Sequence, residues 1–544
     1  MQNTIDLKRR KLLTYAGVSL ASAAAYPHLS FAKTINVSNK ASANFHPDVE
    51  IELKQQVSHV QILSGKKTRV WKVFGKVLKG SKKTVVNMTD TYLAPTIHLH
   101  KGQKVRIYLR NNIPASSILH WHGLHVPSNM DGNPMNAIDS GETYVYEFEI
   151  LNRAGTYWYH SHAHGVTAKQ VYSGLAGFFI VSDKEEQALG LPSGNYDIPL
   201  VIQDRSFDNN NQLQYSNHMM QRMQGFLGNQ IMINGQPDFV LPVSTRAYRL
   251  RLLNGSNSRI YKLAWDNGMP MTVIGTDGGL LERPEKVPYI MLGPAQRREI
   301  WVDFSHQKVG TELTMRSIPF AVSSHGMMGG GGMMGRGMMG GGGMMGRGMM
   351  GGRRGGMMSG SSLPLGGDYP VLKVRVSKKA TGGNSLPKRL TSIKPLQIKH
   401  ANNADDPRTI SLSMRHMSAM LNGRSYKMND IRPDETIPIN SLQLIEIDNG
   451  YRRRHGMMTM AHPMHIHGEQ FQIIKRQVAS SSQTDYESVS SGFVDNGWHD
   501  TTLVMPGEKV TILKPFNDFK GIFMYHCHNL EHEDMGMMRD FLIE

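Results

Sequence analysis

The chain has 544 residues, 40% of them hydrophobic and 19% charged, which is ordinary for a soluble globular protein and too long for one hydrophobic core. The lack of any run of 18 apolar residues excludes a membrane-spanning helix, and a single cysteine excludes an internal disulfide framework. The formal net charge of +17 comes from basic residues that are scattered through strand-like segments. We therefore expect a solvated basic surface and no nucleic-acid binding.

The N-terminus has the pattern of an export signal. Residues 8–11 are basic and contain the pair Arg9-Arg10, residues 12–26 are Ala-rich and apolar, and residues 30–32 fit a small-x-small cleavage site. The arginine pair favours a twin-arginine signal, which bacteria use to export folded proteins, over a general secretory signal with an incidental basic pair. We exclude residues 1–32 from the fold and expect the mature protein in the periplasm.

Three β-rich segments follow, and we place domains at residues 45–185, 190–380 and 390–544. Each segment consists of short runs of alternating apolar and polar residues, separated by Gly, Pro, Asn and Asp turns. This pattern predicts an all-β protein built from sandwiches or barrels. The middle segment has no clustered Cys or His, so we interpret it as a spacer that holds the outer two together.

The first domain carries two His-x-His pairs on probable strands or strand ends, namely His120/His122 and His160/His162. Because successive side chains of a strand alternate between its faces, both imidazoles of a pair face the same side. His98 and His100 have the same spacing, but we interpret them as an exposed strand face. We expect His164 to lie past its strand and leave it out.

Within the middle segment, residues 326–358 consist of Gly, Met and Arg alone and contain six Met-Met pairs. A glycine-rich tract cannot form a packed core, so we expect a flexible surface loop. Thioether sulfur is a soft ligand that favours Cu(I). We favour a role in gathering cuprous ions over an inert insertion.

The third domain contains the lone cysteine, Cys527, followed by His532 and Met537. Cys, His and a weak axial Met on one short loop are three of the four ligands of a blue-copper electron-transfer site. His462 lies three residues before another His-x-His pair and is free to supply the fourth. The alternative is a buried cysteine that packs as a small hydrophobic side chain.

The two histidines beside Cys527 point away from it if the segment is a strand. They lie about 6.6 Å apart at ~3.3 Å per residue, which suits ligands of two neighbouring ions. Cys527 would then connect an electron-accepting copper covalently to a separate metal cluster. Eight imidazoles suit a cluster of three coppers between the first and third domains, and they come from four pairs, His120/His122, His160/His162, His465/His467 and His526/His528.

The motifs HWHG, YHSH, HPMHIH and HCHNLEHEDMGM together resemble those of the multicopper oxidases, a family that includes laccases, ascorbate oxidase and bacterial copper-efflux oxidases. The resemblance covers essentially all of the mature chain and implies three tandem cupredoxin-like domains with a Greek-key β-sandwich or barrel fold. It implies four copper ions: type 1 copper at His462, Cys527, His532 and Met537; type 2 copper at His120 and His465; and a type 3 pair at His122, His160, His162, His467, His526 and His528.

The resemblance implies an enzyme that takes single electrons from a donor at type 1 copper and passes them through Cys527 and its flanking histidines. Four electrons and four protons then reduce O2 to two waters. Asp131 and Glu533 resemble acidic residues that relay protons in this family. The alternatives are turn formation by Asp131 and plain surface charge at Glu533. Asp500 lies in a segment that also resembles the family, but we assign it no role.

The export signal, the axial methionine and the Met-rich tract resemble a periplasmic copper-efflux oxidase, which oxidises Cu(I) to Cu(II). Two features depart from that subfamily: the tract lies in the second domain, and no aspartate stands just before His462. The alternatives are a broad-specificity laccase that oxidises small phenols and a non-enzymatic protein that sequesters copper. We expect a monomer with a thioether site for Cu(I) near His462, formed by Met414, Met417, Met458 and Met460.

Overall fold

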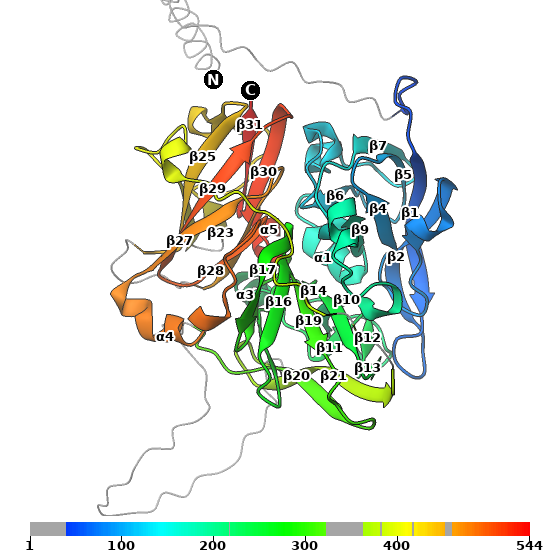
Figure 1. Ribbon diagram of the computed structural model, residues 1–544. Helices are drawn as coiled ribbons and strands as arrows, with labels where there is room; N and C mark the ends of the chain where they lie inside the picture. The colour runs from blue at the N-terminus through cyan, green and yellow to red at the C-terminus, as the bar shows by residue number, and fades with distance from the viewer. Residues whose placement is uncertain are drawn as a thin grey trace, which may run out of the picture. The chain divides into compact units, whose positions relative to one another are not determined.

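The computed structural model describes residues 40–216, 218–322, 363–380, 383, 385–415, 418–451 and 460–544. The predicted signal peptide at 1–32, the tract at 326–358, Met417 and Met458 lie outside these residues. The described residues form six β-sheets in three consecutive pairs, which confirms the prediction of an all-β protein with three cupredoxin-like domains (Figure 1). The domain limits 45–185, 190–380 and 390–544 stay predictions.

The first pair of sheets has the strand orders β2-β1-β5-β7 and β3-β4-β9-β8-β6. In β1, Val49, Ile51 and Leu53 are buried and the residues between them are partly exposed, which is the period of two of a strand with one face on a core. The elements are β1 Val49–Val60, β2 Thr68–Lys79, β3 Val85–Val86, β4 Thr96–His100, β5 Lys104–Asn112, β6 Leu119–His122, β7 Thr143–Glu149, β8 Gly155–Ser161, α1 Thr167–Ser173 and β9 Ala176–Ser182.

The second pair has the orders β12-β11-β10-β14-β19-β16-β17 and β13-β21-β20-β15-β18, with a hydrophobic core between them. The elements are α2 Lys184–Ala188, β10 Asp197–Arg205, α3 Met219–Gln224, β11 Gln230–Ile233, β12 Gln236–Pro237, β13 Val240–Ser244, β14 Ala247–Asn254, β15 Tyr261–Trp265, β16 Met271–Thr276, β17 Gly279–Val287, β18 Ile290–Leu292, β19 Arg297–Asp303, β20 Glu312–Ser317 and β21 Tyr369–Lys378.

The third pair has the orders β23-β22-β25-β29-β27 and β24-β31-β30-β26-β28. The elements are β22 Arg408–Arg415, β23 Ser418–Leu421, β24 Thr436–Ile437, β25 Ser441–Asp448, β26 His462–Ile466, β27 Gln472–Val478, α4 Gln483–Glu487, β28 Thr501–Val504, β29 Glu508–Phe516, β30 Gly521–Cys527, α5 Leu530–Asp534 and β31 Met538–Ile543. Among the described residues, no helix is long and apolar enough to cross a membrane.

The register of β26 and β30 sorts the predicted ligands of the third domain onto two faces. Met464 lies opposite Cys527, and His465 lies opposite His526. Cys527 and Met464 belong to the hydrophobic core of the third domain, so His465 and His526 point to the other face of the sheet. His462 is an odd number of residues from His465, and this spacing turns it to the Cys527 face.

The first domain presents its histidines from two paired strands. β6 pairs with β8 so that His120 lies opposite His160 and His122 lies opposite Trp158. The indole of Trp158 contacts the His160 imidazole, with ring centroids 4.3 Å apart. Trp158 also belongs to a buried apolar cluster with residues of the second and third domains, including Val201 and Leu530. This cluster fixes the junction at which the three domains meet.

Candidate metal centres

The predicted mononuclear site forms inside the core of the third domain. The Cys527 Sγ atom lies 3.5 Å from His462 Nδ1 and 3.7 Å from His532 Nδ1. Met537 is fully buried in the same apolar cluster, and its carbonyl accepts a 3.0 Å hydrogen bond from the Cys527 amide. The Asn529 amide also donates to Sγ over 3.4 Å. The loop between Cys527 and Met537 is therefore closed around the four predicted ligands.

Burial controls the protonation of this site. It raises the pKa of the Cys527 thiol and lowers the pKa of His532 to about 4. Burial also lowers the pKa of His462 well below its ordinary value, and His532 adds to this shift. Both imidazoles are thus neutral at pH 7 and offer lone pairs, whereas the thiol must lose its proton to become a ligand. Two neutral imidazoles and one thiol with a nearby thioether form the donor set of a blue-copper site.

The eight imidazoles predicted for the cluster converge in three groups. In the first group, His120 Nε2 lies 3.3 Å from His465 Nε2. In the second, the Nε2 atoms of His162 and His467 each lie 3.2 Å from His526 Nε2. The third group is made of His122, His160 and His528: His160 Nε2 lies 3.4 Å from His122 Nδ1 and 3.3 Å from His528 Nε2. The neighbours of Cys527 therefore enter different groups, as the sequence predicted.

In most of these imidazoles, the ring nitrogen that faces away from the group donates a hydrogen bond to an oxygen atom, and this bond orients the ring. Such a contact fixes the tautomer and aims the other nitrogen's lone pair. Among the described residues, the Nδ1 atoms of His162 and His528 have no hydrogen-bond partner. The oriented rings and their acceptors are His120 with Asp131 O at 2.6 Å, His467 with Asp131 Oδ2 at 2.6 Å, His160 with Ser161 O at 2.9 Å, His526 with Cys527 O at 3.1 Å, His465 with Asp500 O at 2.8 Å and His122 with Asp500 Oδ1 at 3.0 Å.

This arrangement fits metal ions. Lone pairs on nitrogens 3.2–3.4 Å apart repel each other unless a cation lies between them. Burial first, and neighbouring imidazoles second, lower the pKa of His162 and His465 well below 6.5, so protons do not supply that charge at pH 7. Two nitrogens at about 2 Å from one ion in near-tetrahedral geometry have a separation of this size. Imidazole groups of this kind suit copper.

Two buried carboxylates flank the histidine cluster. Asp131 Oδ1 lies 3.4 Å from His120 Nδ1, in addition to its contact with His467. Burial alone would raise the pKa of Asp131, but His467 and His120 together lower it below its ordinary value. Glu533 Oε2 lies 3.3 Å from His526 Nδ1, and burial together with the neighbouring Asp534 raises the pKa of Glu533 well above its ordinary value. The surroundings therefore favour the ionised form of Asp131 and the protonated form of Glu533.

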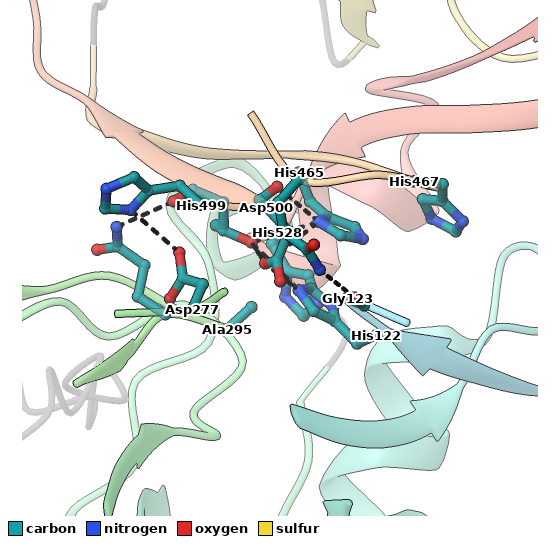
Figure 2. A network of polar contacts seen from close by, with 12 residues as sticks. His122, Gly123, Asp277, Ala295, His465, His467, His499, Asp500 and His528 are labelled. Carbon is teal, nitrogen blue, oxygen red and sulfur yellow. Dashed lines mark hydrogen bonds and ion pairs between the residues drawn. The ribbon is translucent and has the colours of Figure 1, made fainter. Parts of the chain in front are cut away.

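Asp500 and Arg297 are site residues that the sequence did not predict. Asp500 accepts from His122 through its side chain and from His465 through its carbonyl, and Figure 2 shows it between these rings. Arg297, from β19 of the second domain, donates to Asp500 Oδ1 over 2.8 Å. Gly123 has φ +86°, and a Cβ atom there would lie 2.4 Å from Asp500 Oδ2, which accounts for the glycine in HWHG.

The second domain is thus more than the predicted spacer. Its Arg297 supports the carboxylate that sets the tautomer of His122, the one oriented ring whose Nδ1 faces its group. The sequence gave only a weak indication of a role for Asp500, because this residue lies in a segment that resembles the multicopper oxidases. The contact itself joins residues 203 positions apart and could not be read from spacing.

The other sequence predictions have mixed outcomes. His98, His100 and His164 are exposed, in agreement with leaving them out. Glu533 is 2% exposed, so it is not a surface charge. Met460 precedes β26, where its carbonyl accepts from Asn449, and Met414 packs against the core of the third domain. With Met417 and Met458 outside the described residues, the four-methionine site stays a prediction.

The fold and the sites define a class of protein: cupredoxin-like sandwiches with a Cys-His-Met site joined through one tripeptide to a histidine cluster. Family models described as multicopper oxidase match residues 70–186, 198–317 and 391–544. The chain is 30% identical over 460 residues to the multicopper oxidase mco of Staphylococcus aureus, covering 85% of this chain and 84% of the relative.

Solved structures give the same result. The McoA multicopper oxidase from the hyperthermophile Aquifex aeolicus matches with a TM-score of 0.70 and 31% identity over 92% of this chain and 97% of the other. A multicopper oxidase from Campylobacter jejuni, described as a metallo-oxidase, matches with a TM-score of 0.67 and 26% identity over 91% of each chain. The chain belongs to the multicopper oxidase family. It is an oxidoreductase that uses copper and O2.

Proposed function

We propose that this enzyme binds four copper ions and oxidises Cu(I) to Cu(II) in the periplasm. His462, Cys527, His532 and Met537 would hold type 1 copper, and His120 and His465 would hold type 2 copper. The remaining imidazoles divide by their geometry into two sets of three, one for each type 3 ion: His162, His467 and His526; and His122, His160 and His528. When bound, the copper ions accept single electrons and transfer four of them to O2.

The chain's own residues supply the remaining functions. Cys527 is covalently joined to His526 and His528, so one tripeptide links the mononuclear site to two of the imidazole groups. Glu533 is a buried carboxyl 3.3 Å from His526 Nδ1 with a raised pKa, so it would deliver protons to the O2 site. Asp131 holds His120 and His467 in the tautomer that presents Nε2 to the cluster.

The outer edge of the type 1 site supports a small inorganic donor. His532 is fully buried, and its Nε2 atom donates to the carbonyl of Met223 over 3.1 Å. A phenol therefore cannot form a hydrogen bond with this imidazole edge. The chain is rich in methionine, with 37 Met, and thioether sulfur is a soft ligand that favours Cu(I).

Steady-state O2 consumption by the copper-loaded protein tests the proposal. We expect faster O2 uptake with Cu(I) than with a small phenol, and a lower rate with Cu(I) after deletion of residues 326–358. A faster rate with the phenol that survives this deletion would support a laccase instead. No O2 uptake with either donor would indicate copper sequestration.

The proposed location rests on the N-terminal sequence. Replacing Arg9 and Arg10 together by Lys should keep the folded protein in the bacterial cytoplasm if the twin-arginine route exports it. Periplasmic protein in undiminished amount after this double substitution would contradict that route.

A further inference from the structure

A cavity of about 210 Å³ lies where the first domain packs against the second. Trp158 and Phe178 of the first domain line it together with Val201 and Leu253 of the second, and all four side chains are buried. Met88 also belongs to the cavity wall and is partly exposed. The cavity therefore borders both the apolar junction of the domains and a side chain near the protein surface.

The two amide side chains on the cavity wall already bind the protein itself. Gln203 accepts from the Tyr92 hydroxyl over 2.8 Å and donates to a main-chain carbonyl over 3.1 Å. Asn234 bonds with an amide and a carbonyl of the β10 main chain, over 2.9 and 3.0 Å. Thr96 supplies a hydroxyl as a further polar group of the wall. A ligand with several polar groups would lose its water without equivalent partners here, whereas a small apolar molecule favours such a site.

The indole of Trp158 lies against both the cavity and one group of the histidine cluster. Its ring centroid is 4.3 Å from that of His160, 5.2 Å from that of His122 and 5.4 Å from that of His528. Among the described residues, the buried Nε1 atom of Trp158 has no hydrogen-bond partner, so packing holds this ring in place. A molecule in the cavity is thus one aromatic ring away from a complete set of three imidazoles.

We propose that this cavity binds O2 and supplies it past Trp158 to the histidine cluster. O2 is a small apolar molecule, and its transfer from water into an apolar space raises its concentration beside the site that consumes it. The size is sufficient, since an apolar cavity of roughly 150 Å³ in another protein takes up xenon or benzene. The inference rests on the proposed reduction of O2 at the cluster and holds for any electron donor.

The kinetic test fills the cavity with Val201→Phe and compares it with Val240→Phe, the same substitution at a 37% exposed position of β13 outside the cavity wall. We expect Val201→Phe to raise the KM for O2 by about threefold or more, with kcat at saturating O2 and the KM for an organic dye donor unchanged. Copper content and blue absorption should match the wild type. Val240→Phe should resemble the wild type in every respect. A raised KM for the donor alone would make the cavity a donor site and overturn the inference.

Xenon gives a measurement that needs neither turnover nor a folded variant. Crystals of the copper-loaded wild type under xenon pressure should show an anomalous peak between Trp158 and Val201, and this peak should be lost in Val201→Phe. A wild-type cavity without xenon would overturn the inference, as would an unchanged KM for O2 in a variant that has lost the peak. Faster turnover with a phenol than with Cu(I), together with the expected xenon and KM results, would refute the proposed donor and leave the O2 cavity standing.

Discussion

Cys527, His462 and His532 belong to one sandwich and meet within its own hydrophobic core, whereas the histidine cluster takes four imidazoles from each of two sandwiches. The thiol site depends on the register of two adjacent strands and one short loop. The cluster depends in addition on how the first and third domains contact each other, and on Arg297 from the second. Loss of the thiol should therefore leave the cluster in place, and damage at the contact between Arg297 and Asp500 should affect the cluster and leave the thiol site intact.

The largest effect is expected from Cys527→Ser. A hydroxyl cannot replace the thiolate as a copper ligand, so oxidase turnover and the blue absorption should both be lost. The cluster lies on the other face of the sheet, and its copper should remain. Copper analysis together with electron paramagnetic resonance of type 2 copper checks this. Loss of cluster copper in the variant would show that the two sites do not form independently.

The second effect concerns Glu533 and the pH dependence of turnover. Its raised pKa keeps the carboxyl protonated to a higher pH than an ordinary glutamate, and this proton donor is lost as the pH rises through that pKa. The wild-type kcat should therefore fall on the alkaline side. Glu533→Gln should lower kcat by about 10²-fold or more and remove this alkaline fall. A variant with the wild-type pH profile would assign the proton delivery to another group.

The third effect concerns the contact between the second and third domains. Asp500→Asn weakens the pairing with Arg297 and with His122. Hydrogen bonds that orient a metal-binding histidine typically contribute about 10–100-fold in metal affinity or activity. We expect that loss in cluster copper affinity, with the blue absorption unchanged. Arg316→Gln, which breaks an exposed ion pair with Asp368 in the second domain, is the matched control and should bind copper like the wild type.

The smallest effect is expected at the exposed histidines of β4. His98→Ala and His100→Ala lie outside both sites, so the double variant should keep the full copper content and a free energy of unfolding within about 1 kcal/mol of the wild type. Copper analysis and denaturant unfolding measure the two quantities. A drop in bound copper would show that His98 and His100 were wrongly left out of the ligand pairs.

The convergence of the predicted ligands could be anticipated because strand geometry is periodic. A spacing of two places both histidines of a pair on one face, and the spacing of three between His462 and His465 separates the two sites. The division of the imidazoles into groups was not predictable, since it depends on ring orientation. His122 presents Nδ1 rather than Nε2 because Asp500 binds its other nitrogen.

The supports of the sites were also hidden from the sequence. Arg297 is 203 residues from Asp500, and Met223 is 309 residues from His532. Such contacts depend on how whole domains pack, and no local pattern encodes them.

Anomalous X-ray diffraction at the copper edge, on crystals of the copper-loaded protein, is the most direct measurement. Four peaks per chain are predicted. One should lie between His462, Cys527 and His532, one between His120 and His465, and one within each set of three imidazoles. Density in the thiol site alone, or a cluster region without copper, would contradict the convergence of the two outer domains on a shared metal centre.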